Sequence, residues 1–286
     1  MAVIYGQLHV DEKYKATLEP NLYHKTPFAD GRTFTSKYEE GAAGGIFVRK
    51  LGTTAVEVGT PGRDFVDEAS RDDLIPVVFN NNFQKSKKIY GVQAAAVATP
   101  LANESLKVAN EEVSESWTLS GLACLINEGK AATATDAITA KTVKQAVIAV
   151  RKEIVAAKGS ADVVLCSPEL YAAILEQAGS EFVPQSNEFT NATGQIGKWL
   201  GCTFYEVSAL AEAQGKYYDS ANALKTVSFA KVDFIMYNHE ALSIIPNFSV
   251  ARIVDSENFA GSKAQVELNS AFKVTNQNLV RVRKHV

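Results

Sequence analysis

The most regular pattern of apolar and polar positions lies between residues 101 and 130. Small and apolar residues recur there at steps of three and four, at Leu106, Ala109, Val113, Trp117, Ser120 and Cys124. This spacing marks one face of an α-helix, and the glutamates of the segment fall largely outside that stripe. A helix of about 25 residues is roughly 37 Å long, enough to span a small domain. We therefore predict a long amphipathic helix whose packed stripe includes Leu106, Val113 and Trp117.

A second helix is predicted over residues 137–158. Its apolar stripe consists of Val143, Val147, Val150 and Ile154. Asp136 has a side chain suited to capping the first turn, and Lys158 and Gly159 are typical of a helix end. We expect this helix to begin directly after Asp136.

A short apolar run at residues 161–166 predicts a buried strand that leads into a third helix. Ser167 is a favoured N-cap residue, Pro168 fits a first helical turn, and Gly179 is typical of the end. Further along, residues 196–208 predict an amphipathic turn followed by a strand. Strands are also predicted, from alternating or continuous apolar runs, within 227–246, 264–274 and 279–286. This mixture indicates an α+β fold.

The first 85 residues lack the apolar content of a core. Residues 1–40 show neither helical nor strand periodicity but carry scattered aromatic side chains. They predict an extended arm that orders against another surface, although an ordinary frayed terminus stays open as the alternative. Glycines and alanines at 41–45 then precede a long two-stranded hairpin, with Val56 and Val58 alternating before turn residues at 59–62. Because an isolated hairpin is marginally stable, we expect it to lie on a neighbouring molecule.

Charged residues divide this hairpin into two ends. An acidic group lies near the tip and a basic group near the base. We expect both groups to take part in contacts between subunits, at Arg63, Asp64, Asp67, Glu68, Arg71, Lys85, Lys87 and Lys88. The alternative, that these charges simply face solvent, stays open.

Composition narrows the class of protein. The 286 residues carry a net charge of −3, and 46% are hydrophobic. This indicates a folded chain and argues against a dedicated nucleic-acid binder, because Lys and Arg supply the affinity for phosphate. Weak, nonspecific contact with DNA stays open. No basic segment followed by an apolar core opens the chain, and no apolar run reaches about 18 residues, so we expect neither classical secretion nor a membrane span.

Candidate chemistry is sparse. Cys166 ends a predicted strand, where nucleophiles often lie, but no histidine stands in a recognisable Cys/His signature, and a buried core cysteine is the favoured interpretation. The three cysteines predict free thiols rather than a disulfide. His239 lies in a predicted turn without further metal ligands. We expect no enzyme activity, cofactor or metal, and a small cysteine hydrolase using Cys166 is the least favoured alternative.

The order of these parts resembles the major capsid proteins of tailed bacteriophages with the Hong Kong 97-type fold. The resemblance covers nearly the whole chain and rests on the ensemble rather than on any one motif. The stretches that carry it are ACLINEG at the end of the long helix, IGKWLGCTFYEVS, NHEALSII and NSAFKVTNQNLVRV.

The resemblance implies four parts of a shell subunit. They are an N-terminal arm at 1–40, an extended hairpin (E-loop) at 41–85, a peripheral domain with the spine helix at 86–130 and 263–286, and an axial domain at 131–262. It also implies pentamers and hexamers of an icosahedral shell that encloses double-stranded DNA, with the polar segment 180–195 near the centre of each.

The resemblance further implies partners. Family members with an N-terminal scaffolding domain have many residues ahead of the arm, whereas this sequence starts at Met1 almost directly in it, so a separate scaffolding protein is expected. A portal, a decoration protein and nonspecifically bound DNA complete the expected partners, with assembly in the host cytoplasm and a final place in the virion. An encapsulin-like compartment, which shares the fold but encloses protein cargo, is the alternative.

Overall fold

The protein is represented by a computed structural model. The structure describes residues 26–40, 46–51, 72–91, 101–178, 182–184, 194–211 and 214–285. The α-helices in these ranges are α2 (Leu101–Glu128), α3 (Val143–Ala156) and α4 (Pro168–Ala178). Short 3-10 helices are η1 (Pro27–Ala29), η3 (Ser208–Ala211), η4 (His239–Ala241) and η5 (Gln277–Leu279). None of the helices in the described ranges is long and apolar enough to span a membrane.

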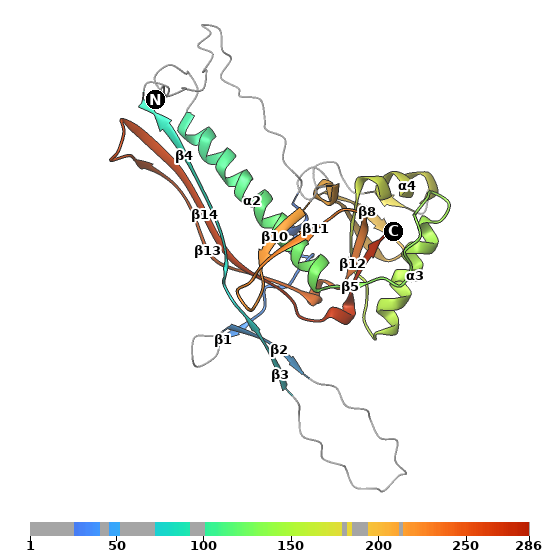
Figure 1. The fold of residues 1–286 in the computed structure, drawn as a ribbon. Coiled ribbons are helices and arrows are strands. Elements are labelled where there is room, and N and C mark those ends of the chain that lie inside the picture. The colour runs from blue at the N-terminus through green and yellow to red at the C-terminus, as the bar shows by residue number, and fades with distance from the viewer. Residues whose placement is uncertain are drawn as a thin grey trace.

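A seven-stranded sheet forms the larger part of the core, at the end of the molecule that carries α3 and α4 (Figure 1). Its spatial order is β5 (Lys130–Ala131), β15 (Val280–Lys284), β12 (Val232–Tyr237), β6 (Val163–Cys166), β9 (Cys202–Glu206), β8 (Gln195–Trp199) and β7 (Val183–Pro184). Side chains alternate between the two faces along each strand. Phe234 and Met236 pack with α3 and α4, whereas Ile235 and Tyr237 join the cluster that includes the C-terminal end of α2. Both faces of this sheet are therefore covered.

A three-stranded antiparallel sheet lies along α2. It consists of β13 (Leu242–Asp255), β14 (Gly261–Val274) and β4 (Asn81–Tyr90), in that order. Figure 1 shows the helix following the length of the sheet. Val266 of β14 packs against Ala109 and Val113, with Leu106 and Phe83 beside them. One face of this sheet is thus covered by α2.

Two smaller antiparallel units complete the fold. One is the ribbon β1 (Glu39–Glu40), β2 (Ile46–Leu51) and β3 (Asp72–Val77), which points away from the body (Figure 1). Its pairing of Leu51 with Asp72 confirms strands at the base of the predicted hairpin. Val56, Val58 and the turn at 59–62 lie outside the described residues. The other is the hairpin β10 (Gln214–Tyr218) and β11 (Leu224–Ser228), which packs against α2.

The long predicted helix is confirmed as α2. Ala109 and Val113 are buried, and Leu106 and Trp117 are half-buried. At the C-terminal end of α2 the buried surface is wider than the predicted stripe. Every residue from Ser120 to Ile126 is buried there. The seven-stranded sheet, the β10–β11 hairpin and Phe28 of η1 pack around this end, so none of these seven residues faces water.

The predicted buried stripe of α3 is confirmed, since Val143, Val147, Val150 and Ile154 are all buried. Its predicted start is wrong, because α3 begins at Val143 rather than after Asp136. Thr139 and Thr142 form a local turn in which the Thr139 amide donates to Thr142 Oγ1 at 2.9 Å. Such side-chain bonds to the backbone compete with helix formation, which delays the helix by several residues.

The strand before α4 and the cap of that helix are confirmed. Val163 to Cys166 form β6, and the Leu170 amide donates to Ser167 Oγ at 3.3 Å. The next prediction, an amphipathic turn before a strand, is wrong in its first half. Residues 195–206 form a β-hairpin in which Leu200 and Gly201 both have positive φ, the backbone of a tight two-residue turn.

Residues 26–36 pack on the body of their own chain, which corrects the prediction that all of 1–40 orders only on another surface. Phe28 is buried edge-on against Trp117, with ring centroids 6.0 Å apart. Gly121 leaves room for this ring, because a Cβ there would lie 2.6 Å from Phe28. Asp30 Oδ2 accepts a hydrogen bond from the Tyr205 hydroxyl at 2.7 Å. Residues 1–25 lie outside the described ranges.

Sheet pairing also divides the chain differently from the predicted domains. The boundary between 262 and 263 lies at the start of β14 and would separate it from β13, with which it pairs from Leu242 to Asp255. The last strand, β15, pairs with β12 in the seven-stranded sheet rather than with the elements along α2. Hydrogen-bonded pairing between distant strands cannot be read from the sequence, and the resemblance that implies the boundary does not contain this pairing.

Candidate contact surface

The predicted contact residues fall into two groups in the structure. Arg63, Asp64, Asp67, Glu68 and Arg71 lie outside the described residues. The three lysines lie on β4, where alternate side chains point to opposite faces of the three-stranded sheet.

Lys85 and Lys87 face α2 and meet a single carboxylate. Their Nζ atoms lie 2.9 and 2.7 Å from the two carboxylate oxygens of Glu112. Burial alone raises the pKa of Glu112, but the two lysines outweigh it and hold the pKa below its usual value. Their nearest opposite charge is therefore in their own chain, and their predicted role between subunits stays a prediction.

Lys88 points to the opposite face and stands directly across from Lys263 of β14. Like charges at directly opposed positions of a sheet repel each other. Neither lysine forms an ion pair within the part of the chain that the structure describes, although Lys263 lies 5.8 Å from the centre of the Phe259 ring. Two adjacent positive charges of this kind are suited to binding carboxylate groups of another molecule.

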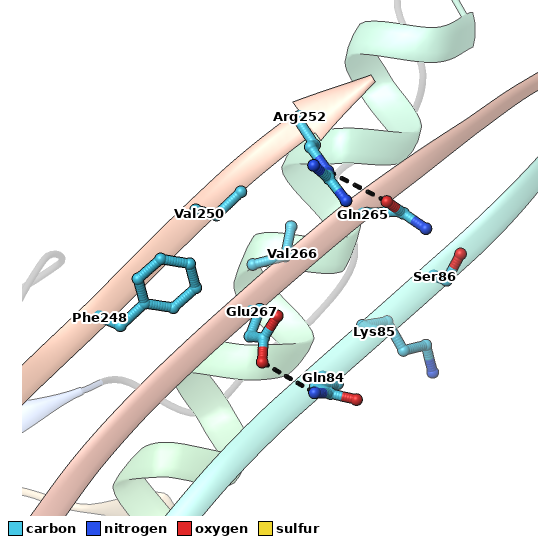
Figure 2. Close-up of a pocket in the computed structure, with 9 residues that line it drawn as sticks. All are labelled: Gln84, Lys85, Ser86, Phe248, Val250, Arg252, Gln265, Val266 and Glu267. Carbon is cyan, nitrogen blue, oxygen red and sulfur yellow. Dashed lines mark hydrogen bonds between the residues drawn. The ribbon is translucent and has the colours of Figure 1, made fainter. Parts of the chain in front are cut away.

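The face of the three-stranded sheet that points away from α2 forms a shallow open groove. Figure 2 shows residues from all three strands around it. The side chains around it are those of Gln84, Ser86, Phe248, Val250, Arg252, Gln265 and Glu267. Lys85 and Val266 also border the groove, but their side chains point to the α2 side of the sheet. We call this groove and the adjoining Lys88–Lys263 pair the outer sheet face.

Polar side chains on the outer sheet face are bonded to one another. Glu267 Oε1 accepts hydrogen bonds from the side chains of Asn82 at 3.0 Å and Gln84 at 2.8 Å. These bonds lower the pKa of Glu267. Arg252 Nε donates to Gln265 Oε1 at 3.1 Å. Polar and charged side chains of all three strands are thus linked to one another by hydrogen bonds on this face.

Strand β13 adds apolar surface and an open edge. Phe248 is 49% exposed although it lies within a strand. β13 pairs with β14 on one side, and on the other side the structure places only the bridge from Thr35 to Ser243, near the start of the strand. An edge strand presents backbone N–H and C=O groups to any chain that comes alongside it. Charge, an exposed ring and an edge that pairs with no further strand in the described ranges together suit binding to a protein surface.

The candidate catalytic cysteine is not accessible. Cys166 is buried, its thiol donates to the Tyr205 carbonyl at 3.3 Å, and burial raises the pKa of the thiol far above its usual value. A nucleophilic cysteine needs the opposite shift and access to substrate. The buried thiol therefore gives no support to the alternative of a Cys166 hydrolase.

The other candidate residues, the cysteines and His239, make contacts within the fold. All three cysteines are free and buried. His239 Nδ1 lies 2.9 Å from Asp162 Oδ2, as expected of a hydrogen-bonded turn histidine. No group of three His, Cys, Asp or Glu side chains in the described ranges is placed to hold a metal ion.

Sequence reasoning missed most of the outer sheet face. It predicted no contact role for Phe248, Arg252, Lys263 and Glu267 on this face, or for Glu112 on the opposite one. For β14 the signal was present, because Lys263, Gln265 and Glu267 alternate with apolar residues and so mark a polar face. The pairing register that places Lys263 opposite Lys88 cannot be read from the residues of either strand.

Comparison with known proteins finds similarity in structure but not in sequence. No protein-family model matches the sequence, and no curated protein matches it. Solved structures do match. A chain from Mycobacterium phage Che8 is 15% identical with a TM-score of 0.66, and the match covers 96% of this chain and 97% of that one.

Two further matches have capsid in their descriptions. The capsid structure of the cyanophage P-SCSP1u is 10% identical with a TM-score of 0.71, covering 96% of this chain and 92% of that chain. The mature capsid of bacteriophage PhiM1 is 12% identical with a TM-score of 0.66, covering 98% and 92%. At these identities the likeness establishes a shared fold over nearly the whole length of both chains.

Proposed function

Because nearly the whole chain has the fold of phage capsid structures, we propose that this protein is the major capsid protein of a tailed bacteriophage. The observation that carries the proposal is the extent of the match to a capsid structure, 96% of this chain and 92% of the cyanophage P-SCSP1u chain. It is not confined to one sheet or one motif. The role is structural, and the subunit acts by binding copies of itself.

The finer proposal is a Hong Kong 97-type subunit that forms pentamers and hexamers of an icosahedral shell around double-stranded DNA. In this arrangement 1–40 is the arm, 41–85 is the extended hairpin, and α2 is the spine helix. Sheet pairing favours a peripheral domain in which α2 packs with β4, β13 and β14, and an axial domain that contains the seven-stranded sheet with α3 and α4. The long sheet and α2 then belong to one part, as their packing suggests.

The outer sheet face is the proposed receiving surface for a neighbouring subunit. Lys88 and Lys263 stand together there without an acidic partner in the described part of the chain. The predicted hairpin carries Asp64, Asp67 and Glu68. Opposite charges across an interface steer and align the two partners, so these acidic groups suit the lysine pair of the next subunit.

The first experiment is negative-stain electron microscopy of the purified full chain at increasing concentration. Closed particles or five- and six-membered rings are expected. A chain that stays a compact monomer at high concentration would contradict the proposal. The contents of the particles separate the two shell functions, because nuclease-protected DNA indicates a capsid and co-purified protein indicates an encapsulin-like compartment.

A second experiment addresses the contact itself. Lys88→Glu with Lys263→Glu should leave the subunit folded but raise the concentration needed for assembly, and wild-type assembly should weaken as salt screens the pairing. Deleting residues 60–73 should likewise give a folded subunit that closes no particles. Loss of folding on that deletion would place the hairpin in the core instead.

The remaining partners stay proposals. A separate scaffolding protein, a portal and a decoration protein are expected, with DNA held by nonspecific contact, assembly in the host cytoplasm and a place in the virion. Co-expression with the neighbouring genes of the source genome, followed by analysis of particle composition, tests each of them.

A further inference from the structure

The outward side of α3 is rich in apolar residues for a helix at the surface. Ile148 and Val155 are 46% and 49% exposed and lie seven residues apart, about two helical turns along one stripe. Ala149, Lys152 and Ala156 occupy the same exposed side. A surface helix ordinarily carries mainly polar residues opposite its buried stripe. This face is therefore suited to burial against another surface.

The neighbouring helix α4 has a matching exposed side. Leu175 is 56% exposed, and Ala172 is exposed one turn before it. Glu169 and Glu176 flank these two residues at the surface. α4 contains no lysine or arginine, so its outer side combines small and apolar groups with negative charge only.

The outer side of α3 has the opposite charge. The one acidic residue of the helix, Glu153, bonds to Arg281 Nε at 2.9 Å within the same chain. Exposed positive charge remains at Arg151 and Lys152. Within the described ranges neither Lys152 nor Glu176 forms an ion pair. The two helices thus offer apolar surfaces of similar character with complementary charges.

We propose that the outer side of α3 binds the outer side of α4 in a second copy of this chain. Lys152 faces Glu176 of the other copy, and Ile148 and Val155 pack against Leu175. The inference rests on the proposed shell function and names one surface through which subunits associate. Because every subunit carries both surfaces, the same contact can repeat from copy to copy. Repetition makes individually weak contacts effective.

Cysteine crosslinking tests which helices meet. All three native cysteines are buried, so an introduced surface cysteine is the main reactive thiol of the native chain. We would prepare full-length Ala149→Cys and Ala172→Cys separately, mix them under assembly conditions and oxidise. A linked dimer in the mixture, and none with either variant alone, is expected. No dimer in the mixture, or a dimer from Ala149→Cys alone, would overturn the pairing of α3 with α4.

Charge exchange provides a second test. Lys152→Glu and Glu176→Lys should each raise the concentration needed for assembly by roughly tenfold or more, since repulsion replaces attraction at every repeated contact. The double variant restores opposite charges and should assemble nearly as the wild type does. Lys216→Glu, an exposed charge reversal on β10, is the matched control and should assemble normally. A double variant as defective as the single variants would refute the direct pairing.

The two proposals fail in different ways. If the wild-type chain forms no oligomer at any concentration, the shell function fails. If the wild type forms particles but both single charge variants do so at the same concentration, the shell function stands and the α3–α4 contact is wrong. Thermal melting of each variant separates an assembly defect from misfolding, because exposed substitutions of this kind should leave the melting temperature nearly unchanged.

Discussion

The two main sheets differ in what covers them. The seven-stranded sheet has helices on one side and the end of α2 on the other, and every residue of its strand β12 is buried. In the described part of the chain, α2 covers one face of the three-stranded sheet, and the other face carries Phe248, Arg252 and the Lys88–Lys263 pair. The first sheet is enclosed on both faces, whereas the second has one face and most of one edge uncovered by the described residues.

This difference separates stability from assembly within one chain. Substitutions in the seven-stranded sheet should unfold the subunit, and substitutions on the outer sheet face should leave it folded but impair association. α2 connects the two regions, because its C-terminal end is buried against the first and its middle packs against the second. The predictions below test this division in order of decreasing effect on stability.

Phe234→Ala should have the largest effect. The ring is fully buried between the seven-stranded sheet and α3 and α4, and its removal should cost about 3 to 5 kcal/mol of unfolding free energy. Urea denaturation followed by circular dichroism measures the loss. Phe234→Leu, which keeps a large apolar side chain, is the control and should lose less. A loss below about 1 kcal/mol would show that this face is loosely packed.

Trp117→Ala should lower the free energy of unfolding by about 3 kcal/mol. The half-buried ring packs against Phe28 and Phe272, and its Nε1 donates a hydrogen bond to the buried Ser270 hydroxyl at 3.0 Å. Trp117→Phe keeps an aromatic ring and should lose about 1 kcal/mol, mainly the hydrogen bond. The same denaturation assay compares them. Equal losses would mean that the ring contributes little and the hydrogen bond dominates.

Glu112→Gln should cost about 1 kcal/mol at neutral pH through the ion pairs with Lys85 and Lys87. The lowered pKa sets the sign of the pH dependence. The carboxylate stabilises the fold above its ordinary pKa near 4.5, and this is lost as the pH falls through the lower folded-state pKa. Wild type and variant should therefore converge in melting temperature on acidification, and a constant difference at all pH values would contradict this account.

Phe248→Ala should have the smallest effect on stability, within about 0.5 kcal/mol, because the ring is half exposed on the outer sheet face. Assembly measured by light scattering should nevertheless weaken. Phe248→Tyr retains the ring and serves as the control. An unstable Phe248→Ala subunit would show that this face contributes to folding and would remove the contrast between the two sheets.

Elements fixed by local pattern were predictable from the sequence. The stripe of Val143, Val147, Val150 and Ile154 and the cap at Ser167 depend on neighbours three or four residues away, and both are confirmed. The predicted start of α3 after Asp136 is wrong although the cause is also local, because the side-chain bond between Thr139 and Thr142 forms a turn where the first helical turn was expected.

Features that depend on distant residues were not predictable. Phe28 fits a space left by Gly121, more than ninety positions later, and nothing near Phe28 in the chain indicates it. Lys85 and Lys87 read as a basic patch in sequence, but the packing of β4 along α2 brings Glu112 between them. The candidate contact surface was therefore recognised in part by charge, while its register and its exposed ring came only from the structure.

The ring of Phe28 has a mechanical consequence. The ring packs between Gly121 and Trp117. The backbone that follows is hydrogen-bonded at Thr35 to β13 of the three-stranded sheet. A pull on the chain ahead of Thr26 would therefore be transmitted directly into α2 and, through that rigid rod, to both sheets at once. Tension applied at one end of such a subunit would be shared across the whole body instead of peeling away its first residues.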